Sequence, residues 1–289
     1  MAQLDRRLPS NVDGAFFVDD SCIDCGTCYW MAPTTFAREG SMSRVYQQPE
    51  DAKPSRRAEL ALLACPTSSI GCDSGRDLAP AVAAIPDLIE GSVYHCGYHS
   101  EKSFGAASYL VRRPEGNVLV DSPRFTRPLV RRLEEWGGLS LIFLSHCDDV
   151  ADSRKYAEHF GCDRVLHLDD VGDSTRDVEI QIEGVEPVAL DDALLVLPVP
   201  GHTRGSSCLL YDGRFLFSGD HVAWNARLEQ VYAFRSACWY DWEIQIESMR
   251  RLAEHDFAWI LPGHGAPCHF DVSAMRHEMQ RCIEWMQAR

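Results

Sequence analysis

Four cysteines near the N-terminus constrain this chain more than any other feature of its sequence. Cys22, Cys25 and Cys28 follow one another at three-residue steps, and Cys65 stands later in the chain, directly before Pro66. Three thiolates at this spacing can hold three corners of an iron-sulfur cubane within one short loop, while the fourth corner needs a more distant thiolate. Structural zinc sites usually take two separated cysteine pairs instead. The spacing therefore predicts a 4Fe-4S cluster bound by Cys22, Cys25, Cys28 and Cys65.

Composition excludes several classes of protein. Twelve cysteines in 289 residues are too few for a disulfide scaffold of this length, so clustered cysteines indicate metal binding in a reducing compartment. A net charge of -15 argues against a general nucleic-acid-binding surface. The sequence has no apolar run long enough to span a bilayer and no apolar core of a secretory signal. We expect a soluble cytoplasmic protein without nucleic-acid or membrane partners, with a plastid location as the alternative.

The pattern of the chain changes near residue 80. Residues 1–80 hold the cysteines, residues 77–86 read as a linker, and a more regular segment covers residues 90–289. Apolar runs in this second part predict many strands and few long helices, which favours an α+β domain with a buried sheet layer. The expected strands include residues 139–145, 194–200, 207–212 and 214–220, and the expected helices residues 151–160, 242–255 and the C-terminal segment. Function in such a domain sits in the loops that follow strands.

The cysteine segment resembles a known family. The run Cys22-Ile23-Asp24-Cys25-Gly26-Thr27-Cys28, with the later Cys65-Pro66, is similar to single-cluster bacterial-type ferredoxins over roughly residues 12–75. The resemblance implies a small ferredoxin-like domain. A low-potential cluster in a fusion protein usually passes single electrons to a neighbouring group, so the second domain decides the function.

Potential metal ligands follow several predicted strands of the second domain. They lie in the segments SHCDDVADS (145–153), PGHTRG (200–205), SGDHVAW (218–224) and LPGHG (261–265). A glycine before a histidine lets the backbone turn sharply at a strand end and present the imidazole into a cleft. If these loops converge, they form a site of histidines and aspartates.

The order of these motifs resembles the metallo-β-lactamase fold, a four-layered αββα sandwich, over roughly residues 90–289. The resemblance implies that His202 and His264 bind metal and that Asp220 is the carboxylate that bridges two metals when two are present. It also matches His146 to the first histidine of the family's His-x-His-x-Asp-His loop.

The loop after His146 departs from the family pattern. Asp148 stands where the family has its second histidine, and the following Asp-His pair is out of register, with Asp152-Ser153 two residues late. Either Asp149 or Asp152 then supplies the carboxylate of a second metal position. The alternative for Asp148, Asp149 and Asp152 is that they cap the following helix.

Three functions remain open from the sequence. The first is an oxidoreductase in which the cluster exchanges electrons with a mono- or dinuclear iron site, because a carboxylate-rich ligand set suits iron at least as well as zinc. Flavodiiron proteins, redox members of this fold, also place an acidic residue at the position of Asp148. The second is a zinc-type hydrolase of esters or thioesters in which Asp152 or Asp220 holds a metal-bound water. The third is a redox sensor that catalyses nothing.

Partners and supporting residues follow from the same reasoning. We expect a small-molecule substrate, with an electron-transfer protein as a further candidate partner. The segment YHCGYHS contains His95 and His99, which we predict to be packed or hydrogen-bonded rather than metal ligands. His221 and Cys147 are predicted to lie next to the metal ligands and to support them without binding metal.

Overall fold

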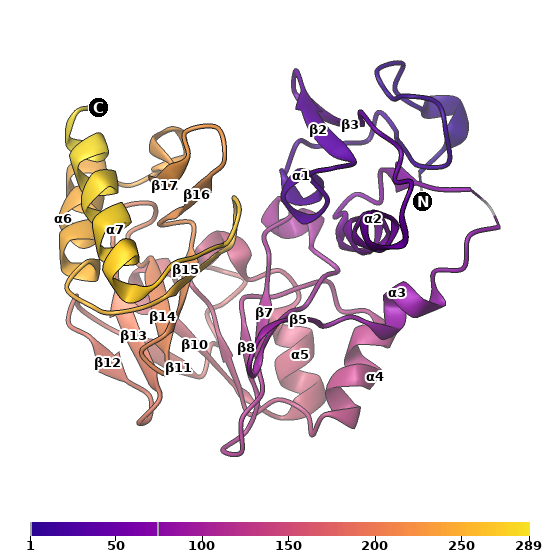
Figure 1. Cartoon of the computed structure of the whole chain (residues 1–289). Coiled ribbons are helices and arrows are strands. Elements are labelled where there is room, and N and C mark those ends of the chain that lie inside the picture. Colours follow the sequence, from indigo (N-terminus) through magenta and orange to yellow (C-terminus); the bar gives the residue numbers. More distant parts are fainter. Residues whose placement is uncertain (1, 74) are drawn as a thin grey trace. The chain divides into compact units, whose positions relative to one another are not determined.

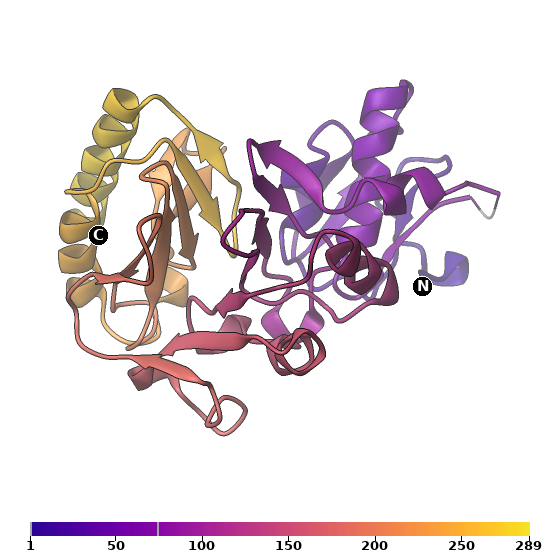
Figure 2. The same ribbon diagram turned by 90° about the horizontal axis from the view of Figure 1, so that it is seen from below.

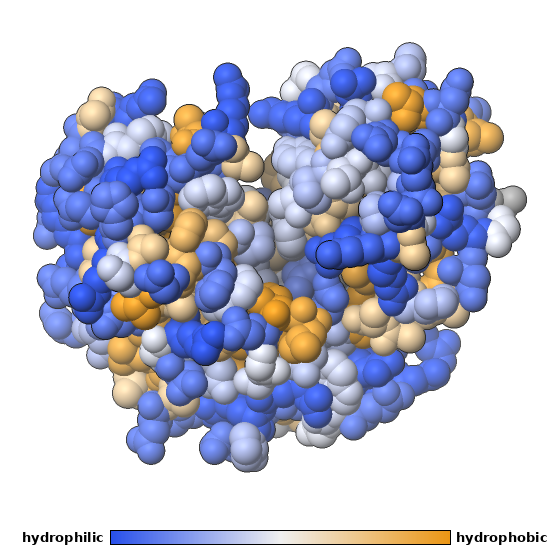
Figure 3. Space-filling model, in the orientation of Figure 1, coloured by the Kyte–Doolittle hydropathy of each residue, from blue (hydrophilic) through white to orange (hydrophobic). Residues whose placement is uncertain are grey.

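The computed structural model describes residues 2–73 and 75–289, which form two compact units. The first unit contains residues 1–117 and 122–138, and the second contains residues 118–121 and 139–289. Most of the surface visible in Figure 3 is hydrophilic, as expected for a chain with 25% charged residues. Among the described residues, none of the helices has the length and apolar character needed to cross a membrane.

The first unit combines short helices with two-stranded and three-stranded pairings. Its helices are α1 (Thr27–Met31), α2 (Ala52–Ala64), α3 (Ala79–Ala83) and α4 (Arg127–Glu135). Its strands are β1 (Phe17–Val18), β2 (Phe36–Glu39), β3 (Met42–Val45), β4 (Ile70–Gly71), β5 (Asp87–Glu90), β6 (Val93–His95) and β7 (Tyr109–Val111). The pairs β1–β4 and β2–β3 are antiparallel, and so is the row β5–β6–β7.

The segment expected to be a linker is partly helical. Helix α3 occupies its middle, with Pro80 in the first turn, where a proline costs no helix hydrogen bond. The side chains of Ala81 and Ile85 are buried. Alanine-rich sequence of this kind forms a helix readily once it has a surface to pack against, so the change of composition near residue 80 does not mark a free connector.

The second unit contains the other strands and the longest helices. Its strands are β8 (Val118–Val120), β9 (Leu141–Phe143), β10 (Asp163–His167), β11 (Ile180–Ile182), β12 (Val188–Ala189), β13 (Leu194–Pro198), β14 (Ser207–Tyr211), β15 (Phe215–Gly219), β16 (Ala223–Asn225), β17 (Gln230–Tyr232), β18 (Trp259–Pro262) and β19 (Cys268–His269). Its helices are α5 (Ser153–Phe160), α6 (Trp242–Leu252) and α7 (Val272–Gln287). The predicted strands after residue 138 and all three predicted helices are confirmed.

Helices cover the sheets of this unit on both sides. Strands β8, β9, β10 and β11 run parallel to one another, and α5 packs on β9 and β10. The second sheet has the order β12-β13-β14-β15-β18-β19. Helices α6 and α7 lie side by side on its outer face (Figures 1 and 2). The unit therefore contains the helix, sheet, sheet and helix layers expected from the sequence.

Helix α7 shows why these layers form. Asp271 caps its first turn by accepting a hydrogen bond from the backbone N–H of Ala274. Its buried residues recur at helical spacing and join the apolar core with residues of β14, β15 and α6; they include Met275, Met279, Cys282, Ile283 and Met286. Burial of this stripe fixes the helix on the sheet, so the ends of β13, β15 and β18 are held in place beneath the metal-ligand loops.

Candidate metal centres

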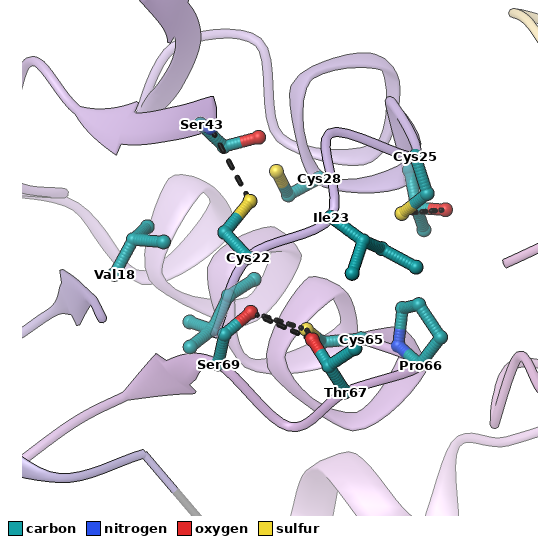
Figure 4. A pocket seen from close by; sticks show the side chains of 12 residues that line it. Val18, Cys22, Ile23, Cys25, Cys28, Ser43, Cys65, Pro66, Thr67 and Ser69 are labelled. Atoms are coloured by element: carbon teal, nitrogen blue, oxygen red, sulfur yellow. Dashed lines mark hydrogen bonds between the residues drawn. The ribbon is translucent and has the colours of Figure 1, made fainter. Parts of the chain in front are cut away.

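The four predicted cluster cysteines line one pocket. Cys22 and Cys25 lie in the loop before α1, Cys28 lies in its first turn, and Cys65 directly follows α2. Figure 4 shows their sulfur atoms around a common space, with apolar side chains such as Val18, Ile23 and Pro66 beside them. In this loop Asp24 and Gly26 have φ angles of 56° and 86°. These left-handed turns wrap the loop around the space.

The donors around the sulfur atoms fit a cluster of bound thiolates. The backbone N–H of Ser43 points at Cys22 Sγ over 3.3 Å, and the hydroxyl of Ser69 lies 3.3 Å from Cys65 Sγ (Figure 4). Burial raises the pKa of Cys25 to about 11 and the pKa of Cys28 well above its usual value. Buried thiols without a cation beside them stay protonated, and bound iron supplies the positive charge that thiolates need. The residues present therefore suit a 4Fe-4S cluster.

The second group of predicted residues comes from the ends of four strands. His146 follows β9, His202 lies between β13 and β14, Asp220 follows β15, and His264 follows β18. Residues Cys147–Asp149 form a 3-10 turn directly after His146. Because these strands end at neighbouring positions of the sheets, the side chains of the loops meet.

The histidines and aspartates approach one another closely. The Nε2 atom of His202 lies 3.7 Å from Asp220 Oδ2 and 3.9 Å from Asp148 Oδ2. The Nε2 atom of His146 lies 3.8 Å from Asp220 Oδ2, and its Nδ1 atom lies 3.9 Å from Asp149 Oδ2. Within the described residues, two triplets have converging ligand atoms: His146 with Asp148 and His202, and His146 with Asp149 and Asp220.

Several atoms of these triplets are buried without a hydrogen-bond partner. They are Nε2 of His146, Nε2 of His202 and both carboxylate oxygens of Asp149. Nδ1 of His202 donates to the carbonyl oxygen of Ala237 over 2.5 Å, and Nδ1 of His146 lies 2.9 Å from the hydroxyl of Ser145. A second nitrogen fixed in this way holds a metal-binding histidine with its Nε2 lone pair directed at the ion. The unpartnered atoms are therefore suited to metal ions.

Charge supports the same interpretation. Burial, reinforced by the neighbouring Asp220, raises the pKa of Asp149 well above its usual value. Burial would also raise the pKa of Asp220, but the contact with His264, above all, outweighs it and holds this pKa low. Burial lowers the pKa of His146 to about 4, so its imidazole is neutral at pH 7. Two carboxylates beside the neutral imidazole of His146 form a ligand set that a cation completes.

His264 and Asp152 are placed differently from the other predicted ligands. Nδ1 of His264 lies 2.9 Å from both carboxylate oxygens of Asp220, and neither converging triplet includes His264. Asp152 immediately precedes α5 and lies 3.0 Å from the ammonium of Lys155. Asp148 is the most exposed member of the group, with 55% of its side chain accessible. Asp149, by contrast, is fully buried.

Sequence reasoning missed one carboxylate that supports these loops. Asp170, in the 3-10 turn after β10, accepts hydrogen bonds from the backbone N–H of Cys147, the backbone N–H of Gly205 and the hydroxyl of Thr203. It therefore ties the loop of His146 to the loop of His202. The sequence places Asp170 just after a predicted strand, and this position could have indicated a residue of the site.

Asp121 supports the same region from β8. Its Oδ1 atom accepts a hydrogen bond of 2.8 Å from the backbone N–H of Ser145, one residue before His146. Burial raises the pKa of Asp121 to about 7. Asp121 thus contributes a buried carboxylate that holds the end of β9.

Comparisons with known proteins relate the first part of the chain to a protein family and the second part to a known fold. Residues 18–81 match the family described as the 4Fe-4S single cluster domain of ferredoxin I. The structure of the B3 metallo-beta-lactamase BLEG-1 is similar with a TM-score of 0.52 and 15% identity, over 67% of this chain and 99% of that one. The DIM-1 metallo-beta-lactamase exposed to ceftazidime has a TM-score of 0.50 and 18% identity, over 69% and 95% of the two chains.

A third solved structure, ETHE1 from Myxococcus xanthus, aligns with a TM-score of 0.48 and 18% identity, over 69% of this chain and 90% of that one. No curated protein matches the sequence significantly. The family match and the two structures with higher scores confirm the fusion and the fold class predicted from the motifs. The protein thus joins residues 18–81, which match a single-cluster 4Fe-4S ferredoxin domain, to a domain of metallo-β-lactamase fold.

Proposed function

We propose that this protein is an oxidoreductase in which a 4Fe-4S cluster exchanges electrons with a centre of one or two iron ions in the metallo-β-lactamase fold. Residues 1–80 form the electron-carrying domain in this proposal, and residues 90–289 form the domain that acts on a small-molecule substrate. Cys22, Cys25, Cys28 and Cys65 are the cluster ligands. An external electron-transfer protein supplies or accepts the electrons.

The observation that carries the proposal is the balance of oxygen and nitrogen in the ligand set. His146 and His202 face three carboxylates, those of Asp148, Asp149 and Asp220. Carboxylate oxygen is a harder ligand than imidazole nitrogen, and mixed sets of the two suit iron as well as zinc. Iron bound there would supply one-electron chemistry, and the attached cluster would exchange the electrons with it.

We assign the ligands from the contacts of this group. Asp220 is the shared carboxylate, because its Oδ2 atom lies within 3.8 Å of Nε2 of both His146 and His202. Asp148 completes the first position and Asp149 the second, which His264 joins through its contact with Asp220. We prefer Asp149 to Asp152 because Asp152 faces Lys155, whereas both oxygens of Asp149 are buried without partners.

The exposed side of the centre is where substrate approaches. Asp148 and Cys147 are exposed, and the exposed indole of Trp239 lies against the ring of His202 with 6.2 Å between centroids. His146 and Asp149, by contrast, are buried. The buried ligands are shielded from water, and a small molecule such as dioxygen, peroxide or nitric oxide would reach the centre past the exposed residues.

Elemental analysis of anaerobically purified protein, combined with electron paramagnetic resonance before and after dithionite, tests the proposal. We expect iron clearly above the roughly four atoms that one cubane needs, with a second iron signal. His202→Gln should remove the additional iron and keep the cluster signal, while Cys65→Ser should do the reverse. Both variants should consume oxidant more slowly than the wild type after reduction.

The alternative is a metallohydrolase, favoured by the fold neighbours that are themselves metallo-β-lactamases. In that function zinc would replace iron, and Asp220 or Asp152 would hold the attacking water. Zinc in the centre, together with hydrolysis of an ester, thioester or β-lactam at a rate independent of cluster reduction, would overturn the redox proposal. A centre that binds no metal in the intact protein would exclude both activities and leave a redox sensor.

A further inference from the structure

His95 and His99 form a buried pair next to the cluster-binding segment. Their Nε2 atoms lie 2.7 Å apart, and the two side chains are 4% and 0% exposed. The edge of the Trp30 ring from α1 packs against His95 with 5.3 Å between ring centroids. The prediction that these histidines are hydrogen-bonded is confirmed, but packing alone does not explain why a polar pair is buried here.

A continuous series of polar contacts leads from this pair to a cluster ligand. Nδ1 of His99 lies 2.7 Å from the carbonyl oxygen of Gly105 and 3.1 Å from the hydroxyl of Thr27. The same hydroxyl lies 3.4 Å from Cys25 Sγ. Gly105, with a φ of +86°, passes so close that a Cβ there would lie 2.9 Å from Cys25 Sγ. The contact between Thr27 and Cys25 is thus enclosed by backbone.

The Gly105 carbonyl fixes the direction of one hydrogen bond in the series. A carbonyl only accepts, so Nδ1 of His99 carries a proton and donates to Gly105. Burial lowers the pKa of His95 well below its usual value, so His95 is neutral. In the relay described below, His99 is the neutral Nδ1–H tautomer, and Nε2–H of His95 donates to its Nε2 lone pair over 2.7 Å. When Cys25 binds iron it has no thiol proton, so the Thr27 hydroxyl can only donate to Cys25 Sγ.

We propose that His95, His99 and Thr27 form a hydrogen-bond relay that fixes a donor on Cys25 Sγ and thereby raises the reduction potential of the 4Fe-4S cluster. Thr27 touches the ligand, and the two histidines are positioning residues. The proposal rests on the cluster and is independent of the metal in the second domain. A failed redox proposal for that domain would leave it standing.

His99 matters because the Thr27 hydroxyl has a competing acceptor. The carbonyl oxygen of Gly105 lies 3.3 Å from Thr27 Oγ1, about as far away as Cys25 Sγ. His99 already donates to that carbonyl, and its Nδ1–H also faces Thr27 Oγ1. In the relay, this N–H facing Oγ1 and occupying the carbonyl favours the orientation in which the hydroxyl donates to the sulfur. Hydrogen bonds to cluster sulfur atoms stabilise the more negative, reduced state.

Potentiometric titration of the full-length protein with a reconstituted cluster, followed by electron paramagnetic resonance, tests the relay. Thr27→Val should make reduction about tenfold less favourable, which is about 59 mV for a one-electron couple. Thr27→Ser keeps the hydroxyl and should restore the wild-type potential. Ser69→Ala is the matched control, because it removes a hydroxyl from Cys65 that has no contact to the histidine pair in the structure.

A double-mutant cycle separates a relay from a general disturbance. His99→Leu should lower the potential of the wild type, but not that of Thr27→Val, because the hydroxyl that His99 orients is then missing. The same substitution should add fully to Ser69→Ala. Additive effects of His99→Leu and Thr27→Val, or an unchanged potential in Thr27→Val with full iron content, would overturn the proposal.

His95→Phe provides a second test if Thr27→Val does not retain its cluster. The phenyl ring keeps the contact with Trp30 and removes only the Nε2–H donor to His99. We expect a shift in the same direction as for Thr27→Val and of smaller size. No shift in a His95→Phe protein with an intact cluster contradicts the relay.

Discussion

His264 holds Asp220 in a fork: its Nδ1 atom lies 2.9 Å from each carboxylate oxygen, and its backbone N–H donates to Oδ1 over 3.0 Å. The carboxylate that faces the imidazoles of His146 and His202 is therefore oriented by a third strand end. In contrast to Asp220, Asp149 is buried with no hydrogen-bond partner for either carboxylate oxygen.

Asp149 should make the metal-free protein less stable at high pH. Its pKa in the folded protein lies above the value for an unfolded chain, so the folded state binds more protons and stability falls as the pH rises above about 4. Asp149→Asn should remove this fall and weaken metal binding. Urea unfolding of chelated protein across pH 4 to 8 measures the effect. A wild type and variant with parallel pH profiles would show that Asp149 does not carry this charge.

Gly263 should be intolerant of a side chain. A Cβ there would lie 2.6 Å from Asp149 Oδ2 and 3.0 Å from Asp220 Oδ1, so Gly263→Ala must displace both carboxylates. We expect at least a tenfold loss of metal affinity in the second domain with the cluster intact, since displaced ligands cost affinity steeply. Gly172→Ala is the control, because a Cβ at that position meets nothing within 4 Å. Equal metal affinity in the two variants would contradict the assignment of the carboxylates.

Asp170→Asn should separate the two histidine loops. All three partners of the Asp170 carboxylate are donors: two backbone N–H groups and one hydroxyl. The NH₂ group of an asparagine cannot accept from them, so at least one of these hydrogen bonds is lost. The expected loss is about 2–4 kcal/mol in the free energy of unfolding and about 10- to 100-fold in metal affinity. Asp169→Asn changes the exposed neighbour and should leave both unchanged, as calorimetry and metal titration can show.

Glu179 should stabilise the second unit through the buried guanidinium of Arg164. Hydrogen bonds from Arg164 lower the pKa of Glu179, so this contribution is complete above its unfolded pKa of about 4.3 and is lost as the pH falls through the lower folded value. Glu179→Gln should cost about 1–2 kcal/mol at pH 7, because Glu179 is partly exposed and screened. The difference from wild type should shrink toward pH 3, and a constant difference in denaturant titrations would refute this account.

The cluster segment was predictable because its ligands are local. Three of the four cysteines lie within one loop, so their spacing alone limits what they can bind. The left-handed turns at Asp24 and Gly26 bring the cysteines of this loop together, as their spacing requires. The family match over residues 18–81 bears out the expected cluster.

The second centre was predictable only where a strand end fixes the residue. His146, His202 and Asp220 follow apolar strands, and the structure brings them together. Our preference for Asp149 over Asp152 rests on backbone geometry that no spacing reveals. A 3-10 turn over Cys147–Asp149 directs Asp149 inward, while Asp152 lies at the start of α5. The hydrogen bonds of Asp170 depend on contacts between distant loops, which the sequence does not specify.

The anchoring of both histidine loops by Asp170 has a consequence for how this protein acquires metal. The loops are ordered by a side chain of the chain itself, so the entropy of arranging the ligands is lost during folding and not when an ion binds. A chelator should then empty the centre without unfolding the polypeptide, unlike in zinc fingers. Metals can exchange in a folded protein of this kind, and the supply of ions in the cell, rather than the folding pathway, selects the one that it carries.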